Sequence, residues 1–345
     1  MPKEKSKKEG KNSVDWQGTW NTTKDLAKKT KIATGSILNG TIGNHLENWK
    51  LPLSREMGFY QDGSFVDIQE LVDTILNGKF NKKLCILIHG LVSDETMWKF
   101  PDSLDDYGKL LQSEFGIIPA YVRYNSGRHI SDNGQDLNLL LSALHSLCGK
   151  QIHEIQLITH SMGGLVTRSA CYYGQKTKSK WVRSVTKIVF IGSPHHGAPL
   201  EKFGNYVTSI LGAIPNPFTH LTKKAINLRS AGIKDLRYGL LVEEDWKDKD
   251  PDAFSNSEKT IVPLVPSIQY YVITGTLHQN SGHFLSEFFG DAIVGKGSAL
   301  GKSGNSKYDL NFPKENIAEI PGLTHIKLMH HQEVYSQIRV WFSKK

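Results

Sequence analysis

The fold is decided by residues 155–166, which read Ile155-Gln156-Leu157-Ile158-Thr159-His160-Ser161-Met162-Gly163-Gly164-Leu165-Val166. An apolar, strand-like run passes directly into a helix-like pattern, and a single serine stands at the turn. This layout is typical of a nucleophile elbow, in which a strained strand-to-helix turn lifts a hydroxyl clear of the sheet. Ser161 is therefore the candidate nucleophile. The usual pattern is G-x-S-x-G, and Thr159 replaces its first glycine, so an ordinary βα turn in a Rossmann-like sheet stands as the alternative.

Segments on both sides of this turn predict alternating strands and helices. The run Leu84–Ile88 is fully apolar and is closed by His89-Gly90, which is typical of a central parallel strand covered on both faces. Helices are expected at residues 102–115, 136–147 and 332–342, and strands at 117–124, 184–191, 267–275 and 317–320. This alternation predicts the α/β class, with a mostly parallel central sheet flanked by helices and the elbow strand in its middle.

Two regions interrupt the alternation. Residues 1–80 are predicted as a basic disordered tail followed by a helical appendage, in which Ser64 caps an amphipathic helix over 64–76. The main domain is then expected at 81–345. Within it, residues 199–266 carry the apolar stripe Phe203–Ile214, and we interpret this insertion as a helical cap or lid. Simple packing of the stripe on the domain is the alternative.

Charge is concentrated at the start of the chain of 345 residues. Residues 1–31 contain nine lysines and four acidic residues, so they supply +5 of the formal net charge of +8. Such a tail is usually solvated, with weak contact to an anionic membrane surface as the alternative, and nucleic acid is not an expected partner. We expect no transmembrane helix, because the apolar runs are far shorter than the roughly 18 residues that a membrane span needs.

The location of the protein is expected to be cytoplasmic. No apolar stretch follows the basic tail as it would in a secretory signal. Cys85, Cys148 and Cys171 lie inside apolar patterns and are predicted to be buried thiols in a reducing compartment.

A serine nucleophile needs a base and a carboxylate, and in hydrolases with an elbow these follow in the order Ser, Asp or Glu, His. Asp291 lies on a predicted loop after the strand that ends at residue 275, and His325 lies on the loop after the last strand. Both fit the order. Glu287 is the rival acid, and His330 and His331 are rival bases that lie deeper in the closing helix.

Acyl transfer also needs two N–H donors that stabilise the oxyanion. One is expected to be the amide of Met162, directly after the nucleophile. The other is expected to be the amide of Leu91, on the loop after the first strand of the main domain. His89 is interpreted as a residue that orders this loop.

Taken together, these motifs resemble the lipase and esterase branch of the α/β-hydrolase superfamily, and within it the hydrolases similar to GPI inositol-deacylase. The resemblance covers roughly residues 83–345 and rests on His89-Gly90-Leu91, Val122-Arg123-Tyr124-Asn125-Ser126-Gly127, His160-Ser161-Met162-Gly163-Gly164, Gly192-Ser193-Pro194-His195-His196-Gly197, Gly290-Asp291-Ala292-Ile293-Val294 and Thr324-His325. It implies an α/β-hydrolase fold and a structural role for His195 and His196. The chain departs from the family pattern at Thr159 and at Ala292.

The resulting prediction is a serine ester hydrolase that forms an acyl-enzyme on Ser161 and acts on a small-molecule or lipid ester. An acyltransferase on the same scaffold and a non-catalytic binding protein are the alternatives. No cofactor or metal is expected, because the sequence has no G-x-G-x-x-G, Walker, C-x-x-C or H-E-x-x-H motif. Substrate chain length and oligomeric state are left open.

Overall fold

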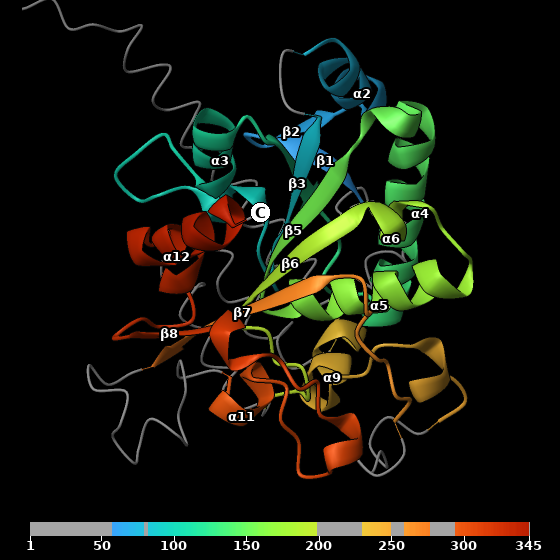
Figure 1. The fold of residues 1–345 in the computed structure, drawn as a ribbon. Helices are drawn as coiled ribbons and strands as arrows, with labels where there is room; N and C mark the ends of the chain where they lie inside the picture. The colour runs from blue at the N-terminus through green and yellow to red at the C-terminus, as the bar shows by residue number, and fades with distance from the viewer. Residues whose placement is uncertain (1–56, 79–81, 199–229, 250–258, 277–293, 345) are drawn as a thin grey trace, which may run out of the picture.

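An eight-stranded sheet forms the centre of the computed structural model, which describes residues 57–78, 82–198, 230–249, 259–276 and 294–344 (Figure 1). The strand order is β2-β1-β4-β3-β5-β6-β7-β8. The strands are β1 (Gly58–Gln61), β2 (Ser64–Val66), β3 (Lys83–Ile88), β4 (Ile118–Arg123), β5 (Glu154–His160), β6 (Val185–Ile191), β7 (Gln269–Thr276) and β8 (Ile317–Pro321). From β4 to β8 every neighbouring pair is parallel, whereas β1 is antiparallel to both β2 and β4.

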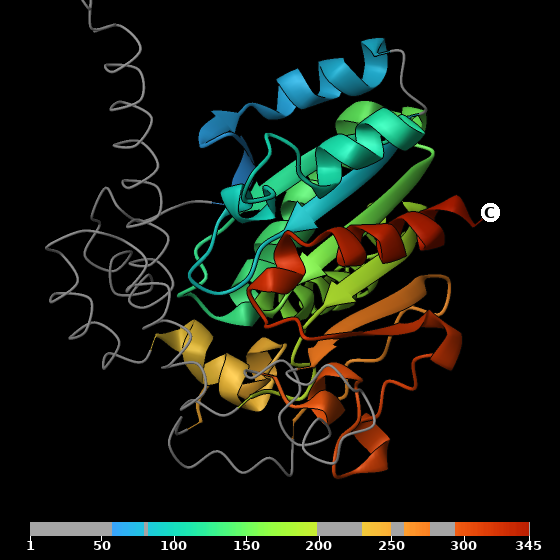
Figure 2. The same ribbon diagram turned by 90° about the vertical axis from the view of Figure 1, so that its left-hand side faces the viewer.

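Helices cover both faces of this sheet. They are α2 (Ile68–Asn77), α3 (Tyr107–Phe115), α4 (Ile130–Cys148), α5 (Met162–Lys176), α6 (Trp181–Ser184), α9 (Ala231–Tyr238), α11 (Lys296–Ala299) and α12 (Gln332–Ser343). Single 3-10 turns occur at Glu95–Trp98, Gly149–Gln151, Glu243–Asp245, Ser306–Tyr308, Lys314–Asn316 and Lys327–Met329. Figures 1 and 2 show α3 and α12 on one face of the sheet and α4 and α5 on the other.

Alternation along each central strand explains the two faces. In β3, Leu84, Ile86 and Ile88 enter the core under α4 and α5, whereas Cys85 and Leu87 enter the core under α3 and α12. Successive side chains of a strand point to opposite faces, so a wholly apolar run is what a strand between two helical layers requires. The predicted α/β class and helix-flanked parallel sheet are therefore confirmed, and this is the α/β-hydrolase fold.

Most predicted elements agree with the structure to within a few residues. The helix predicted at 102–115 begins only at Tyr107, where the Asp106 carboxylate accepts a hydrogen bond from the amide of Lys109 at 2.9 Å. The helix predicted at 136–147 begins earlier, at Ile130. Cys85, Cys148 and Cys171 are buried free thiols, as predicted.

The helix predicted to start at Ser64 is wrong in its first turn. Residues 64–66 form β2, and Asp67 caps α2 instead, accepting from the amide of Gln69 at 2.8 Å. The strand forms because Asp62 and Gly63 both have positive φ, 51° and 82°, which is the backbone of a tight two-residue hairpin turn. Tertiary pairing has therefore overridden the local helical pattern.

This hairpin also joins the main sheet, which differs from the expected appendage over residues 1–80. β1 pairs with β4, and the buried Arg123–Glu95 ion pair lies beneath it, with the Arg123 guanidinium 4.1 Å from the centre of the Tyr60 ring. The Gly63 amide donates to Glu95 at 2.9 Å. Residues 58–78 are thus part of the same sheet and helical layer, while the predicted basic tail lies outside the described residues.

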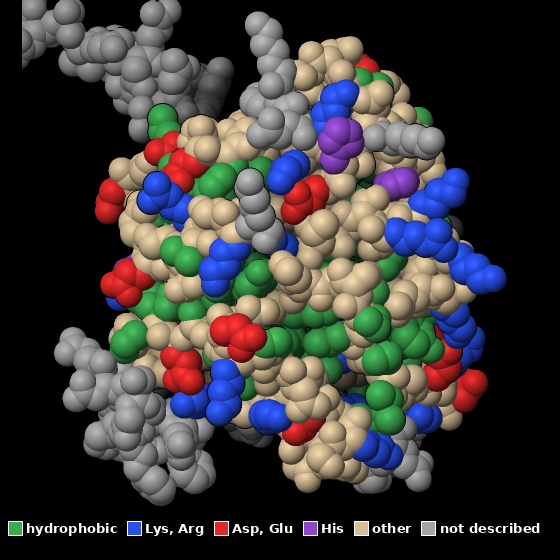
Figure 3. Space-filling model, viewed as in Figure 1, with side chains coloured by type: hydrophobic (Ala, Val, Ile, Leu, Met, Phe, Trp, Pro, Cys, Tyr) green, Lys and Arg blue, Asp and Glu red, His purple; other side chains and the backbone are tan. Residues whose placement is uncertain are grey.

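Charges on the visible surface are mixed. Figure 3 shows Lys and Arg side chains grouped along the edge formed by α4, α5 and α6, with acidic side chains interspersed below and on the opposite edge. In the described segments, no helix is both long and apolar enough to cross a bilayer.

Candidate active site

The turn between β5 and α5 has the strained backbone that the elbow motif predicts. Ser161 has φ 53° and ψ −123°, a region that residues other than glycine rarely adopt. The Ser161 amide donates to the carbonyl of Ile191 at 2.9 Å, which fixes the turn to the end of β6. Among the described residues, the Ser161 hydroxyl has no hydrogen-bond partner, and the side chain is 1 % exposed.

Close contacts with neighbouring segments explain the small residues after the serine. A Cβ on Gly163 would lie 2.4 Å from the carbonyl oxygen of His89, and a Cβ on Gly164 would lie 2.1 Å from the hydroxyl of Ser193. Thr159, two residues before the serine, is accommodated because its hydroxyl donates to the carbonyl of Val189 at 3.2 Å. Threonine therefore fits where the usual pattern has glycine.

The structure brings the His325 loop to the elbow. His325 lies between β8 and α12 and is completely buried. Its carbonyl accepts a hydrogen bond from Nε2 of His160 at 3.0 Å, and the two imidazole centres are 4.6 Å apart. Because His160 directly precedes Ser161, the predicted nucleophile and the predicted base lie in one buried cluster.

The two rival histidines make contacts elsewhere. Nδ1 of His330 lies 3.4 Å from the carbonyl of Met97, and the ring of His331 accepts from the amide of Glu333 at the start of α12. These contacts hold both rings at the junction with α12 and η1, the 3-10 turn Glu95–Trp98.

The carboxylate of the predicted triad lies outside the described residues. The described chain stops at Thr276 and resumes at Val294, so Asp291 and its rival Glu287 both fall between. Asp291 therefore stays a prediction from chain order.

The loop after β3 passes beside the serine. A Cβ on Gly90 would lie 3.0 Å from the Cβ of Ser161, and the next residue, Leu91, is completely buried. Met162 is the first residue of α5, and the amides of a helix's first turn lack acceptors within the helix. Both candidate oxyanion donors thus lie on segments that adjoin the serine.

His89 orders this loop through its ring and its carbonyl. Its Nδ1 lies 2.8 Å from the Gly90 carbonyl, and its Nε2 accepts from the Tyr124 amide at 3.3 Å. The Tyr124 hydroxyl donates to the His89 carbonyl at 3.0 Å, and the two rings stack at 4.4 Å. The neutral Nδ1–H tautomer satisfies both ring contacts, which matches the ordering role expected from the sequence.

His160 is a residue that the motif analysis did not single out. Its Nε2 must carry a proton to donate to the carbonyl of His325, and burial followed by the proximity of His325 holds its pKa well below the usual range. A neutral His160 therefore positions the His325 loop against the elbow. In the sequence, its position directly before Ser161 is the feature that could have identified it.

The histidine pair after β6 connects the sheet to α11. The amide of His196 donates to the hydroxyl of Ser298 at 3.1 Å, and that hydroxyl donates to the carbonyl of Gly197 at 2.8 Å. The His195 amide donates to the Ser298 carbonyl at 3.2 Å. These main-chain contacts fit the structural role implied for the pair.

Part of the predicted cap is described. The stripe Phe203–Ile214 lies outside the described residues, but α9 of the same insertion packs beside the elbow, where a Cβ on Gly232 would lie 3.0 Å from the Cε of Met162. The buried Asp235 of α9 accepts from the amide of Ile130 at 2.8 Å, which joins α9 to the start of α4.

Comparison with known proteins gives the following matches. The model of the PGAP1-like alpha/beta domain matches residues 122–268, and no curated protein matches the chain significantly. The mature lipase BlEst2 of Bacillus licheniformis is 16 % identical, with a TM-score of 0.46 over 75 % of this chain and 90 % of its own. The esterase Pf2001 of Pyrococcus furiosus is 13 % identical, with a TM-score of 0.44 over 76 % of this chain and 79 % of its own. The chain therefore has the α/β-hydrolase fold, and its residues 122–268 resemble the PGAP1-like alpha/beta domain.

Proposed function

We propose that the protein is a serine ester hydrolase with Ser161 as nucleophile, His325 as base and Asp291 as the carboxylate that orients the base. The observation that carries the proposal is the elbow itself. A buried serine with φ 53° stands next to a histidine loop that is hydrogen-bonded to the preceding residue. Backbone strain of this kind costs of order 1–3 kcal/mol, and it clusters at active sites, ligand clamps and switch regions.

In the proposed mechanism His325 removes the proton from the Ser161 hydroxyl as it attacks the ester carbonyl. The amides of Leu91 and Met162 stabilise the oxyanion of the tetrahedral intermediate. His325 then protonates the leaving alcohol, which leaves an acyl-Ser161 ester. Water, activated by the same histidine, releases the acid and regenerates the serine.

The substrate class that we propose is a small-molecule or lipid ester. Two observations support this class. The sequence motifs resemble those of hydrolases similar to GPI inositol-deacylase, and residues 122–268 match the PGAP1-like alpha/beta domain. In addition, the described part of the insertion, α9, lies beside Met162. A cap in this position would cover the mouth of an acyl pocket. No step of the mechanism needs a metal or a cofactor.

The decisive test is labelling by a fluorophosphonate probe combined with hydrolysis of p-nitrophenyl esters from acetate to palmitate. The wild type should label stoichiometrically at Ser161, and Ser161→Ala should lose both labelling and turnover. Ser142→Ala is the matched control, because Ser142 is half-buried on α4 and its hydroxyl, among the residues that the structure describes, bonds to the hydroxyl of Ser179 at 3.2 Å. If the wild type neither reacts with the probe nor hydrolyses any of the esters, the proposal is wrong and the non-catalytic binding protein is favoured.

The acyltransferase alternative is tested by the products. Adding glycerol or methanol to the reaction should leave free acid as the main product of a hydrolase. Predominant formation of the glycerol or methyl ester would reassign the enzyme as an acyltransferase that uses the same acyl-Ser161.

A further inference from the structure

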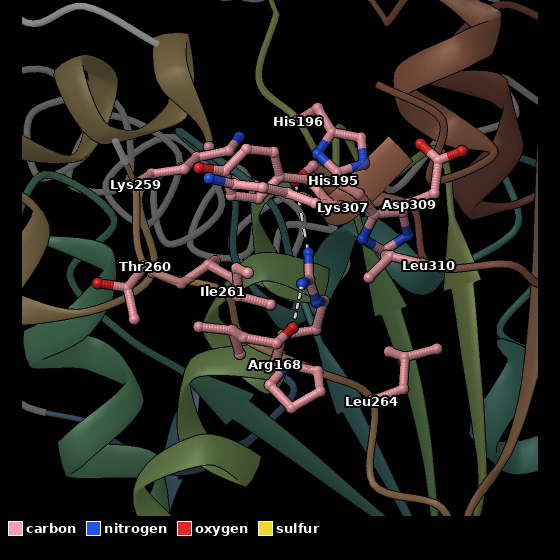
Figure 4. Close-up of a pocket in the computed structure, with 15 residues that line it drawn as sticks. Arg168, His195, His196, Lys259, Thr260, Ile261, Leu264, Lys307, Asp309 and Leu310 are labelled. Carbon is pink, nitrogen blue, oxygen red and sulfur yellow. Dashed lines mark hydrogen bonds between the residues drawn. The ribbon is translucent and has the colours of Figure 1, made fainter. Parts of the chain in front are cut away.

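A basic cavity lies beside α5, away from Ser161. It has a volume of about 190 Å³ and lies between the His195-His196 loop, residues 259–264 and residues 307–310. Figure 4 shows Lys259, Lys307 and the two histidines on one side of the Arg168 guanidinium. Arg168 is seven residues after Ser161 on the helix, about 10 Å along its axis at 1.5 Å per residue.

Arg168 forms the floor of this cavity and is 7 % exposed. Its guanidinium donates to the carbonyls of Val262 at 2.8 Å and His195 at 3.4 Å, and its Nε has no partner among the described residues. No carboxylate of the described segments forms an ion pair with it. Burial lowers the pKa of Arg168 to about 10. Two neutral carbonyls offset only part of the cost of burying a cation.

Two lysines add positive charge to the same cavity. Lys259 donates to the carbonyl of Tyr238 at 3.1 Å, and burial, followed by the nearby charge of Arg168, lowers its pKa to about 8. Lys307 is exposed at the mouth, with its ammonium 4.8 Å from the centre of the Tyr308 ring. Three cationic side chains therefore converge although they repel one another.

The neighbouring carboxylates are engaged by other donors. Asp309 lines the cavity but lies 3.3 Å from the ammonium of Lys302 and accepts from the Ser303 amide at 2.8 Å. Asp245, beyond Lys259, accepts from the amides of Thr260 at 2.7 Å and Leu241 at 3.4 Å. Within the described lining, positive charge thus exceeds negative charge.

We propose that this cavity binds the phosphate group of a small molecule or of a lipid head group. A phosphate would neutralise the converging cations through charge-assisted hydrogen bonds, which are about twice as strong as neutral ones. The cavity is smaller than the roughly 300–1,000 Å³ of sites for drug-sized ligands, which favours a compact anionic group. The proposal does not depend on the chemistry at Ser161. The alternative is that Arg168 only braces the two carbonyls.

The first test is titration of the full chain with sodium phosphate, with sodium chloride of equal ionic strength as the control. Binding is measured by calorimetry and by thermal unfolding. Saturable binding and a rise in melting temperature should occur with phosphate or with glycerol 3-phosphate. Vesicles of phosphatidylcholine with and without phosphatidic acid test the lipid source. If none of the three phosphate probes binds more than the chloride or phosphatidylcholine control, the proposal is wrong.

Paired variants locate the site. Lys259→Gln combined with Lys307→Gln should weaken phosphate binding about tenfold or more, the equivalent of about 1.4 kcal/mol. The matched control is Lys180→Gln combined with Lys314→Gln, which removes the same charge from exposed positions on other segments. Equal weakening by both pairs would show nonspecific attraction and overturn the proposal. Arg168 is left unchanged, because its bonds to the Val262 and His195 carbonyls also support the fold.

Discussion

The elbow around Ser161 and the basic cavity around Arg168 are both built on α5, yet they bury polar groups in opposite ways. At the elbow the buried groups are a hydroxyl, imidazoles and backbone amides, packed so closely that a methyl group on Gly163 has no room. In the cavity, cations surround open space and lack described ion-pair partners. Close packing holds reacting groups in a fixed geometry, whereas unneutralised charge around a cavity favours binding of an anion.

The largest expected effect concerns the elbow alone. Asp291→Asn should lower ester turnover about 10⁴-fold, the loss seen when a triad acid becomes its amide and the histidine adopts the wrong tautomer. Turnover of a p-nitrophenyl ester and phosphate binding should both be measured, and only the first should change. A large loss in Glu287→Gln with a mild one in Asp291→Asn would reassign the carboxylate.

Gly163→Ala tests the close packing. Its methyl group would lie 2.4 Å from the His89 carbonyl, and the backbone must shift to accept it, so we expect the free energy of unfolding to fall by about 3 kcal/mol. The control is Gly295→Ala, where an added Cβ meets no atom within 4 Å. Urea unfolding of both variants checks the difference. Equal stability of the two would mean that the elbow is not closely packed in solution.

His160 tests positioning at the elbow. His160→Phe keeps a ring but removes the donor to the His325 carbonyl, so kcat should fall up to about 100-fold with KM little changed, as for a small misplacement of a catalytic group. His160→Gln retains an N–H donor and should recover part of the loss. If the two variants have the same kcat, the hydrogen bond does not position His325.

Buried histidines at both sites predict an acid-sensitive fold. Burial holds the pKa of His160 and of His195 well below 6.5 and lowers that of His196 to about 4. The unfolded chain binds these protons first, so stability should fall as the pH drops below about 6.5, by about 1 kcal/mol per histidine between pH 7 and pH 5.5. Urea unfolding at the two values measures this slope. If the unfolding free energy of His160→Gln changes as much between the two pH values as that of the wild type, His160 does not contribute to the acid sensitivity.

The smallest expected effect concerns the cap. Replacing Ile210 and Leu211 by serine should weaken hydrolysis of long-chain esters about tenfold more than hydrolysis of acetate, because buried apolar surface contributes about 25 cal/mol per Å². Kinetics on the p-nitrophenyl ester series, with the melting temperature of each protein, test it. Equal losses on both esters with a lower melting temperature would identify the stripe as core.

Local sequence determined the central strands and the elbow. The run Leu84–Ile88 predicted a strand buried on both faces, and Ser161 with its glycines predicted a strand-to-helix turn. Both predictions rest on neighbouring residues, because an apolar run and small residues beside a turn can be read locally. The order of Ser161 and His325 along the chain made His325 the predicted base, and the structure brings the loops of these two residues together. The carboxylate, Asp291, stays a prediction.

Only the tertiary structure decided the rest. Ser64 failed as a helix cap because β2 forms by pairing with β1, which in turn pairs with β4 more than fifty residues away in sequence. The hydrogen bond from His160 to the His325 carbonyl spans 165 residues, and the basic cavity gathers Arg168, Lys259 and Lys307 from three separate segments. A local sequence pattern reflects the hydrophobic periodicity and the secondary-structure propensity of nearby residues. Contacts between side chains that are distant in sequence depend on how the whole chain packs.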